Sequence, residues 1–284
     1  RALAAEIAML PHFPPEAPPP EQLLVGSIFF GGGTPSLLTP EQVARILDAI
    51  AQRFAVAPDA EVTLEANPND LNLAYLRALH EAGVNRLSIG VQSFDDRLLR
   101  RLGRRHDAAG AIAALEAARR AGFDNLSFDL MFALPGQDLT NWQETVRQAV
   151  SFAPEHVSLY HLTIEPGTPF AEWVAAGKLS VPDEDTAADM YEWTIAYLDT
   201  VSYDHYEISN WARRDLQRDW RAQHNLRYWR NQPYLGVGAG AHSCFAGARF
   251  SNVLAPLQYV RLVEQNQRPV AESEVVSEAL AMGE

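Results

Sequence analysis

The segment SIFFGGGTPSLL, residues 27–38, joins a short apolar run to three consecutive glycines and a Thr-Pro turn. Three glycines let a backbone approach a ligand closely, so that its N–H and C=O groups become the recognition surface. No Lys-Ser or Lys-Thr pair follows them, which argues against a nucleotide P-loop. The segment therefore predicts either a ligand-binding loop after a strand or a tight strand–helix turn without a ligand.

Around this segment, apolar strand-like runs alternate with amphipathic helical stretches. We expect strands at 27–30, 61–66, 86–92, 126–132 and 156–163. We expect helices at 40–52, 70–82, 95–102, 107–121 and 140–152. Such alternation predicts parallel strands joined by right-handed crossovers. The strands read as apolar on both faces, as in a sheet covered by helices, and both a doubly wound sheet and a β/α barrel fit this pattern.

The remaining segments are less regular. A helical pattern at 1–10 leads into a Pro-rich connection at 11–20 that cannot be regular structure. A loop at 165–168 and a helix at 183–199 precede an irregular, aromatic-rich stretch at 203–245, and a helical run is expected at 272–282. We therefore divide the chain into a barrel, residues 1–180, and an extension, residues 181–284. Since both ends fall inside helical patterns, we expect a fragment of a longer protein.

Composition narrows the class of protein. The 284 residues carry a net charge of −13, which argues against a broad nucleic-acid surface because phosphate binding needs clustered Lys and Arg. No apolar run approaches the roughly 20 residues that a membrane-spanning helix needs, although peripheral membrane association stays open. Cys244 is the one cysteine, so an intrachain disulfide is excluded, and a cytoplasmic location is expected.

Polar residues stand at the ends of the predicted strands. Glu65 and Gln92 are among the last two residues of predicted strands 61–66 and 86–92, Asp129 lies in strand 126–132, which runs into the turn at 133–136, and Arg104 lies one helix after Gln92. Ligands of α/β proteins bind at the carboxyl ends of parallel strands. Each residue alone could be a hydrogen-bonded core group, but their recurrence at one end predicts a binding site.

These residues belong to longer motifs that resemble a known family. GGGTPSLL (31–38), EANP (65–68), NRLSIGVQSF (85–94), LGR (102–104) and FDLMFALPGQ (128–137) are similar to the radical SAM enzymes around oxygen-independent coproporphyrinogen III oxidase. Within that group the chain resembles the HemW-type haem chaperones. The resemblance implies a partial (β/α)6 TIM-like barrel of about six strands.

The resemblance also implies how S-adenosylmethionine would be bound. Backbone and hydroxyl groups of Gly32, Gly33 and Thr34 would bind its amino group, and Arg104 would pair with its carboxylate. Other polar groups of the ligand would meet Glu65, Gln92 and Asp129. Met131 and the backbone near Thr163 would border the adenine.

One family motif is missing from the sequence. The family holds a four-iron cluster on the three thiolates of CxxxCxxC, and this chain has Cys244 alone. We expect the motif upstream of Arg1, the alternative being a homologue that lacks it. The family's small C-terminal domain is expected to be truncated as well.

The segment HNLRYW, residues 224–229, resembles a HemW-type motif whose His is the family's proposed haem contact. An imidazole can ligate haem iron, and Tyr and Trp offer flat apolar surface, so His224, Tyr228 and Trp229 are the haem-binding candidates. A hydrogen-bonded structural His is the alternative. We interpret His242 and Cys244 as structural. The same half of the chain is rich in further aromatic residues: Trp193, Trp211, Trp220, Tyr203 and Tyr206.

The resemblance leads to a haem chaperone that binds haem and S-adenosylmethionine and passes haem to recipient haemoproteins. The alternative is the oxidase reaction, the oxidative decarboxylation of coproporphyrinogen III propionates. A third hypothesis is an ordinary barrel that binds a phosphorylated metabolite at Gly31–Gly33.

Overall fold

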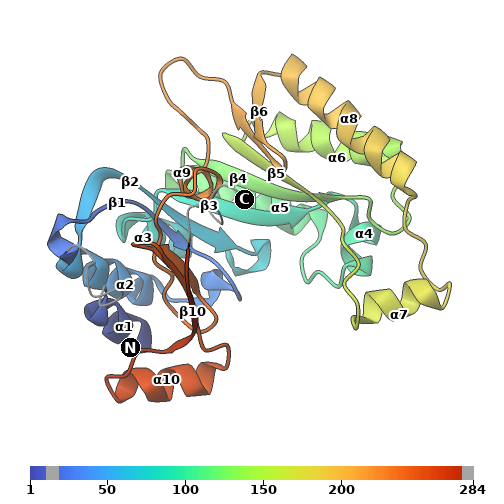
Figure 1. Cartoon of the computed structure of the whole chain (residues 1–284). Coiled ribbons are helices and arrows are strands. Elements are labelled where there is room, and N and C mark those ends of the chain that lie inside the picture. Colours follow the sequence, from blue (N-terminus) through green and yellow to red (C-terminus); the bar gives the residue numbers. More distant parts are fainter. Residues whose placement is uncertain (11–18, 277–284) are drawn as a thin grey trace. The chain divides into compact units, whose positions relative to one another are not determined.

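A curled sheet of mostly parallel strands dominates the structure, a computed structural model that describes residues 1–10 and 19–276 (Figure 1). Within that range the sheet has seven strands in the order β1-β2-β3-β4-β5-β7-β6. The pairs β2/β3, β3/β4 and β4/β5 are parallel, whereas β7 runs antiparallel to β5 and β6. The sheet is the half-barrel expected from the motifs. Its strands are β1 (Leu24–Phe30), β2 (Ala55–Ala66), β3 (Arg86–Gln92), β4 (Leu126–Phe132), β5 (His156–His161), β6 (Tyr203–Glu207) and β7 (Asn210–Arg213).

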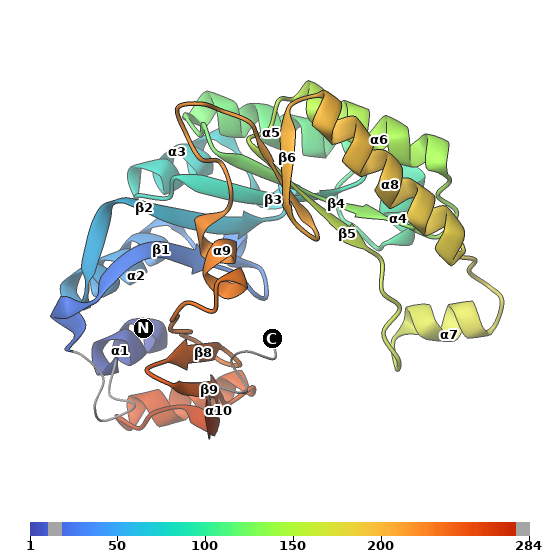
Figure 2. The ribbon, with the colours of Figure 1, turned by 45° about the horizontal axis from the view of Figure 1, so that its top comes forward.

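Helices follow most of the strands, as the alternating pattern predicted. Figure 2 shows α5, α6 and α8 on one side of strands β3–β5. Two of these helices begin at aspartates whose carboxylates accept a backbone N–H of the first turn, Asp107 for α5 and Asp138 for α6. The helices are α1 (Ala2–Met9), α2 (Pro40–Arg53), α3 (Leu73–Glu81), α4 (Asp96–Arg101), α5 (Ala108–Ala121), α6 (Leu139–Ser151), α7 (Pro169–Ala175), α8 (Glu184–Thr200), α9 (Gln223–Trp229) and α10 (Pro256–Glu264).

The two faces of the central strands differ in polarity. On β4, Phe128 and Leu130 are fully buried, and Phe132 packs against Trp142 of α6 with ring centroids 5.6 Å apart, so this outer face meets the helices. Successive side chains of a strand point to opposite faces, so Ser127 and Asp129 lie on the inner face. The expectation of strands apolar on both faces is therefore wrong for β4, because the inner face carries polar groups.

Four local expectations are corrected. Residues 272–275, expected to be helical, belong to the strand β10 (Val270–Val275), while 277–284 lie outside the described residues. Pairing of β10 with β9 (Ala248–Asn252) outweighs the local helical pattern, since tertiary contacts override weak propensities.

The stretch 203–245 contains β6, β7, α9 and β8 (His242–Phe245) and is not irregular throughout. Strand β5 ends at His161, two residues earlier than expected. Of the Pro-rich connection, 11–18 lie outside the described residues, and Pro20–Gln22 form a 3₁₀ turn.

The chain divides into two compact units that are each described separately. One comprises residues 29–39 and 62–222, and the other comprises 1–28, 40–61 and 223–284. In the second unit, buried Glu6 accepts hydrogen bonds from Gly238 N (2.8 Å), Asn252 Nδ2 (2.6 Å) and Tyr259 Oη (2.5 Å), which tie α1 to β9 and α10. The boundary expected near residue 180 stays a prediction.

The helices of the described segments are all too short or too polar to cross a bilayer.

A buried carboxylate joins a helix and three strands of the first unit. Glu155, whose side chain is 4% exposed, accepts hydrogen bonds from Arg119 of α5 at 2.8 and 3.1 Å and pairs with Arg213 of β7 at 3.0 Å. It also accepts the backbone N–H of Leu126, the first residue of β4, at 3.0 Å. Because Glu155 directly precedes β5, one side chain holds this edge of the sheet together.

We predict that Glu155→Ala lowers the free energy of unfolding by about 3 kcal/mol, because it leaves two guanidinium groups without their buried partner. Urea unfolding followed by tryptophan fluorescence measures this loss. The control is Asp124→Ala, which removes the exposed pair with Arg218 and should cost less than about 1 kcal/mol. Equal, small losses in both variants would contradict the assigned role of Glu155.

Candidate functional site

The Gly-rich loop after β1 has the open backbone expected of a ligand-binding loop. Gly32 and Gly33 adopt φ angles of 73° and 64°, and a Cβ built on either would meet no atom within 4 Å. The backbone N–H of Gly32 donates a hydrogen bond to Oε2 of Glu65, at the end of β2, at 3.2 Å. The loop and Glu65 therefore lie side by side, with free space next to the two glycines.

Hydrogen bonds fix the part of the loop that follows the glycines. The Tyr75 hydroxyl of α3 donates to the carbonyl oxygens of Ser36 (3.0 Å) and Leu38 (2.9 Å). The Ser36 hydroxyl donates to Asp70 Oδ2 at 2.7 Å and accepts from the N–H of Asn67 at 3.3 Å. These contacts hold the end of the loop against the segment that follows Glu65.

Asp129 is the centre of a charged group on the inner face. The Ser88 hydroxyl of β3 lies 3.0 and 3.2 Å from its two carboxylate oxygens and donates to the carboxylate. Burial raises the pKa of Asp129, and four neighbours oppose this effect: the hydroxyls of Ser88 and Ser158 and the guanidinium groups of Arg86 and Arg104. Its surroundings are therefore built to offset the cost of desolvating a carboxylate.

Arg104 and Gln92 meet at a second glycine. A Cβ on Gly90 would lie 2.8 Å from Gln92 Nε2, so a larger residue would displace Gln92, and 3.7 Å from Arg104 Nη2, an ordinary packing distance. Gln92 ends β3 with a φ of 66°, which turns its side chain back over the strand. The imidazole Nε2 of buried His106 lies 3.0 Å from the Val91 carbonyl and anchors the loop that carries Arg104 to β3.

The site combines carboxylates with a partly buried cation. Burial and the charge of Asp129 both raise the pKa of Glu65, while the Gly32 N–H lowers it. Burial lowers the pKa of Arg104, and Asp129 counteracts this. Burial, and after it the charges of Asp129, Glu207 and Glu65, raises the pKa of the Tyr160 hydroxyl to about 12, although a hydrogen bond with Ser158 lowers it. The hydroxyl therefore stays protonated. Such a mixture suits a small ligand that carries charges of both signs.

The structure brings most of the predicted ligand-binding residues together. Contacts or charges link Gly32, Glu65, Arg104 and Asp129, and the Gln92 side chain lies beside Gly90, as that of Arg104 does. Gly33 and Thr34 are the next residues of the same loop, and Met131 lies on the inner face of β4 two residues after Asp129. Thr163 is exposed, beyond the end of β5, and no contact joins it to this group in the described structure. That all these residues bind one ligand stays a prediction.

Several residues of this group were missed by the sequence reasoning. Arg86 and Ser88 share the inner face of β3, and Ser158 and Tyr160 share that of β5. Each pair has the i, i+2 spacing of side chains on one face of a strand. That spacing predicts that these side chains share a face with the site residues, whereas the position of a residue at the end of a strand does not.

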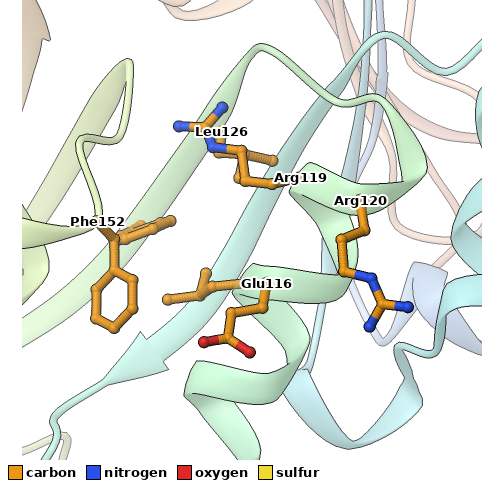
Figure 3. A pocket seen from close by; sticks show the side chains of 7 residues that line it. Glu116, Arg119, Arg120, Leu126 and Phe152 are labelled. Atoms are coloured by element: carbon orange, nitrogen blue, oxygen red, sulfur yellow. The ribbon is translucent and has the colours of Figure 1, made fainter.

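A separate pocket lies on the outer face, where Figure 3 shows Phe152, Glu116 and Arg119 around it. Its volume is 310 Å³, and it is lined by Leu115, Glu116, Arg119, Arg120, Leu126, Phe128 and Phe152. Leu126 and Phe128 are fully buried, and Arg119 is already paired with Glu155. Since outer-face residues of β4 line it, this pocket is distinct from the group around Asp129.

The HNLRYW segment forms the helix α9. Glu61 of β2 caps its N-terminus by accepting the backbone N–H groups of Gln223 (3.1 Å) and His224 (3.0 Å). The His224 ring contacts Ser27 Oγ through Nδ1 (3.2 Å) and Tyr228 Oη through Nε2 (3.0 Å). Tyr228 and Trp229 are 46% and 56% exposed, which leaves aromatic surface accessible beside the imidazole.

Metal-binding groups are sparse in the described part of the chain. No three His, Cys, Asp or Glu side chains of residues 1–10 and 19–276 gather closely enough to hold a metal ion. Cys244 lies in β8 and is the one cysteine of the sequence. The residues of this chain therefore do not fit a cluster that needs three thiolates.

Comparison with known proteins shows which proteins this chain is similar to. Residues 21–149 match the Radical SAM superfamily. The chain is 40% identical over 252 residues to the heme chaperone HemW of Bacillus subtilis (strain 168), covering 88% of this chain and 65% of that protein. It is 41% identical over 273 residues to the mitochondrial radical S-adenosyl methionine domain-containing protein 1 of Bos taurus, covering 91% and 61%.

A solved structure supports the fold. Coproporphyrinogen III oxidase (HemN) from Escherichia coli superposes with a TM-score of 0.80 at 24% identity, over 99% of this chain and 65% of that one. The chain thus spans less than two thirds of the length of these relatives. Residues 21–149 thus form a radical SAM domain, and the half-barrel is the fold of that domain.

Proposed function

We propose that this protein is a haem chaperone that binds haem and S-adenosylmethionine and delivers haem to recipient haemoproteins. The observation that carries the adenosylmethionine part is the convergence of Gly32, Glu65, Gln92, Arg104 and Asp129 in one unit. Similarity to heme chaperones over 88% of the chain supports the haem part. A cytoplasmic location remains part of the proposal.

The residues around Asp129 fit S-adenosylmethionine in charge. That ligand carries an ammonium, a sulfonium and a carboxylate, and the group offers Glu65 and Asp129 for the cations and Arg104 for the carboxylate. The open space beside Gly32 and Gly33 lets the ligand approach the loop backbone. When bound in this superfamily, adenosylmethionine with a cluster supplies radical chemistry, but we assign no redox step to the residues of this chain.

The α9 helix fits a flat ligand with a coordinating metal. Trp229 and Tyr228 present exposed aromatic faces, and the His224 imidazole stands beside them. For Nε2 to reach iron, the Tyr228 hydroxyl 3.0 Å away would have to rotate off it, while Ser27 could keep its contact with Nδ1. This arrangement suggests Tyr228 as a group that competes with iron for the imidazole.

We predict that Glu65→Gln weakens adenosylmethionine binding about tenfold, because one of two carboxylates facing the cations is lost. Isothermal titration calorimetry measures the affinity, and Glu116→Gln on the outer face is the control. Unchanged affinity in Glu65→Gln would contradict the assigned site.

The same Glu65→Gln variant should melt at a higher temperature than the natural protein at pH 7. The folded-state pKa of Glu65 lies above its ordinary value of 4.5, so its ionised form opposes folding once the pH has risen through the folded-state pKa. The gain should vanish below about pH 4.5, where Glu65 is protonated in both states. Melting curves at several pH values test this, and a gain independent of pH would contradict it.

We predict that His224→Ala weakens haem binding about tenfold and changes the visible spectrum, because the axial imidazole is lost. Tyr228→Phe, which keeps the ring and removes only the competing hydroxyl, should bind haem at least as tightly as the natural protein. Haem titration followed in the Soret region distinguishes these outcomes. An unchanged spectrum in His224→Ala would remove His224 from the site, and formation of protoporphyrinogen from coproporphyrinogen III would contradict the chaperone function.

A further inference from the structure

The backbone turns sharply at Gln92, the last residue of β3. Its φ of 66° lies in the left-handed region, which residues other than glycine rarely adopt. The N–H of Ser93 donates to the Val91 carbonyl oxygen at 2.8 Å, so Val91, Gln92 and Ser93 form a γ-turn. A γ-turn whose central residue has a positive φ is rare and strained, and such strain persists only where surrounding contacts hold it.

Buried His106 supplies a contact of this kind. Its Nε2 lies 3.0 Å from the same Val91 carbonyl oxygen, and the residue is 6% exposed. A carbonyl oxygen can only accept, so Nε2 must carry a proton and donate it to this bond. The two lone pairs of the oxygen let it accept from Ser93 and from His106 at once. The carbonyl that closes the turn is therefore held by two donors.

The surroundings of His106 favour a neutral ring near pH 7. Burial lowers the pKa of His106, as does the charge of Arg104, whereas the hydrogen bond to Val91 and the charge of Asp107 raise it, and the net shift is downward. A neutral imidazole has one proton, and the bond to the carbonyl places that proton on Nε2. The direction of this hydrogen bond is thus fixed by its acceptor.

The turn decides where the Gln92 amide lies. A Cβ built on Gly90 would lie 2.8 Å from Gln92 Nε2, so the amide is folded back over Gly90 and fills the place of a side chain there. The same point lies 3.7 Å from Arg104 Nη2, so the amide and the guanidinium lie close together. Because the backbone conformation sets the direction of the side chain, a relaxed backbone at Gln92 would point the amide elsewhere.

We propose that His106 is a positioning residue for Gln92. By donating to the Val91 carbonyl it holds the strained turn, and the turn directs the Gln92 amide, beside Arg104, to the ligand. The inference rests on Gln92 binding the ligand of the proposed function. His106 itself need not touch that ligand.

The first test reads the hydrogen bond directly and needs no ligand. ¹⁵N NMR of the full chain labelled at histidine, with His106 assigned through a His106→Gln variant, should show the Nε2–H tautomer near neutral pH. The Nε2 proton should exchange slowly with water, because the residue is buried. An Nδ1–H tautomer would leave the carbonyl without this donor and would overturn the proposal.

The second test compares two replacements of His106 by isothermal titration calorimetry. His106→Leu removes the donor and should weaken S-adenosylmethionine binding about fivefold. His106→Gln brings an amide N–H near the position of Nε2 and should bind within about twofold of the natural protein. His80→Leu is the control, since His80 packs on Phe123 with ring centroids 5.1 Å apart, outside the turn. Equal losses in His106→Leu and His106→Gln would show that the hydrogen bond has no such role.

A double-mutant cycle shows whether His106 acts through Gln92. Glycine adopts a positive φ without strain, so Gln92→Gly allows the turn and removes the amide. Gln92→Gly alone should weaken binding about tenfold, and adding His106→Leu should change the affinity by less than about twofold. If His106→Leu costs the same factor in both backgrounds, it acts independently of Gln92 and the proposal is wrong.

The outcomes separate this inference from the proposed function. If the natural protein fails to bind S-adenosylmethionine, the proposed function is wrong, while the NMR spectrum still reports whether His106 holds the turn. If the natural protein binds, and His106→Leu binds as tightly as His80→Leu, the positioning role is wrong and the proposed function stands.

Discussion

A desolvated carboxylate on the inner face of the sheet constrains much of what surrounds it. Burial raises the pKa of the Asp129 carboxyl. The hydroxyls of Ser88 and Ser158, on the neighbouring strands, and the charges of Arg86 and Arg104 lower that pKa again. Since a buried, unpaired charge costs several kcal/mol, each of these groups has an electrostatic reason for its place.

The fold makes this concentration possible because of strand periodicity. Outer-face residues such as Phe128 and Phe132 pack against helices, and the alternate residues are free to be polar. Parallel pairing then sets Asp129 beside Ser158, and the Gly-rich loop ends the strand β1 next to Glu65. The same rule keeps the apolar pocket at Leu126 on the other face of β4. The HNLRYW segment is built differently, on a short helix capped by Glu61.

Much of this was predictable from the sequence, because the relevant signals are local. Gly31–Gly33, Glu65 and Asp129, near the ends of predicted strands, predicted a binding site, and the resemblance of the motifs that contain them implied the half-barrel. The rest depended on partners far along the chain. Ser158 and His156 looked like part of an apolar strand until the register placed them opposite Asp129 and Ser127. Residues 272–275 have a helical pattern and form a strand only because β9 pairs with them.

The central claim is that one ligand occupies the inner face between the Gly-rich loop and Asp129. A crystal structure of the protein grown with S-adenosylmethionine tests it most directly. The account predicts electron density for the ligand in contact with the backbone at Gly32 and Gly33 and with the side chains of Arg104 and Asp129. Ligand density in the outer pocket at Phe128, or none in crystals of protein that binds the ligand in solution, would contradict it.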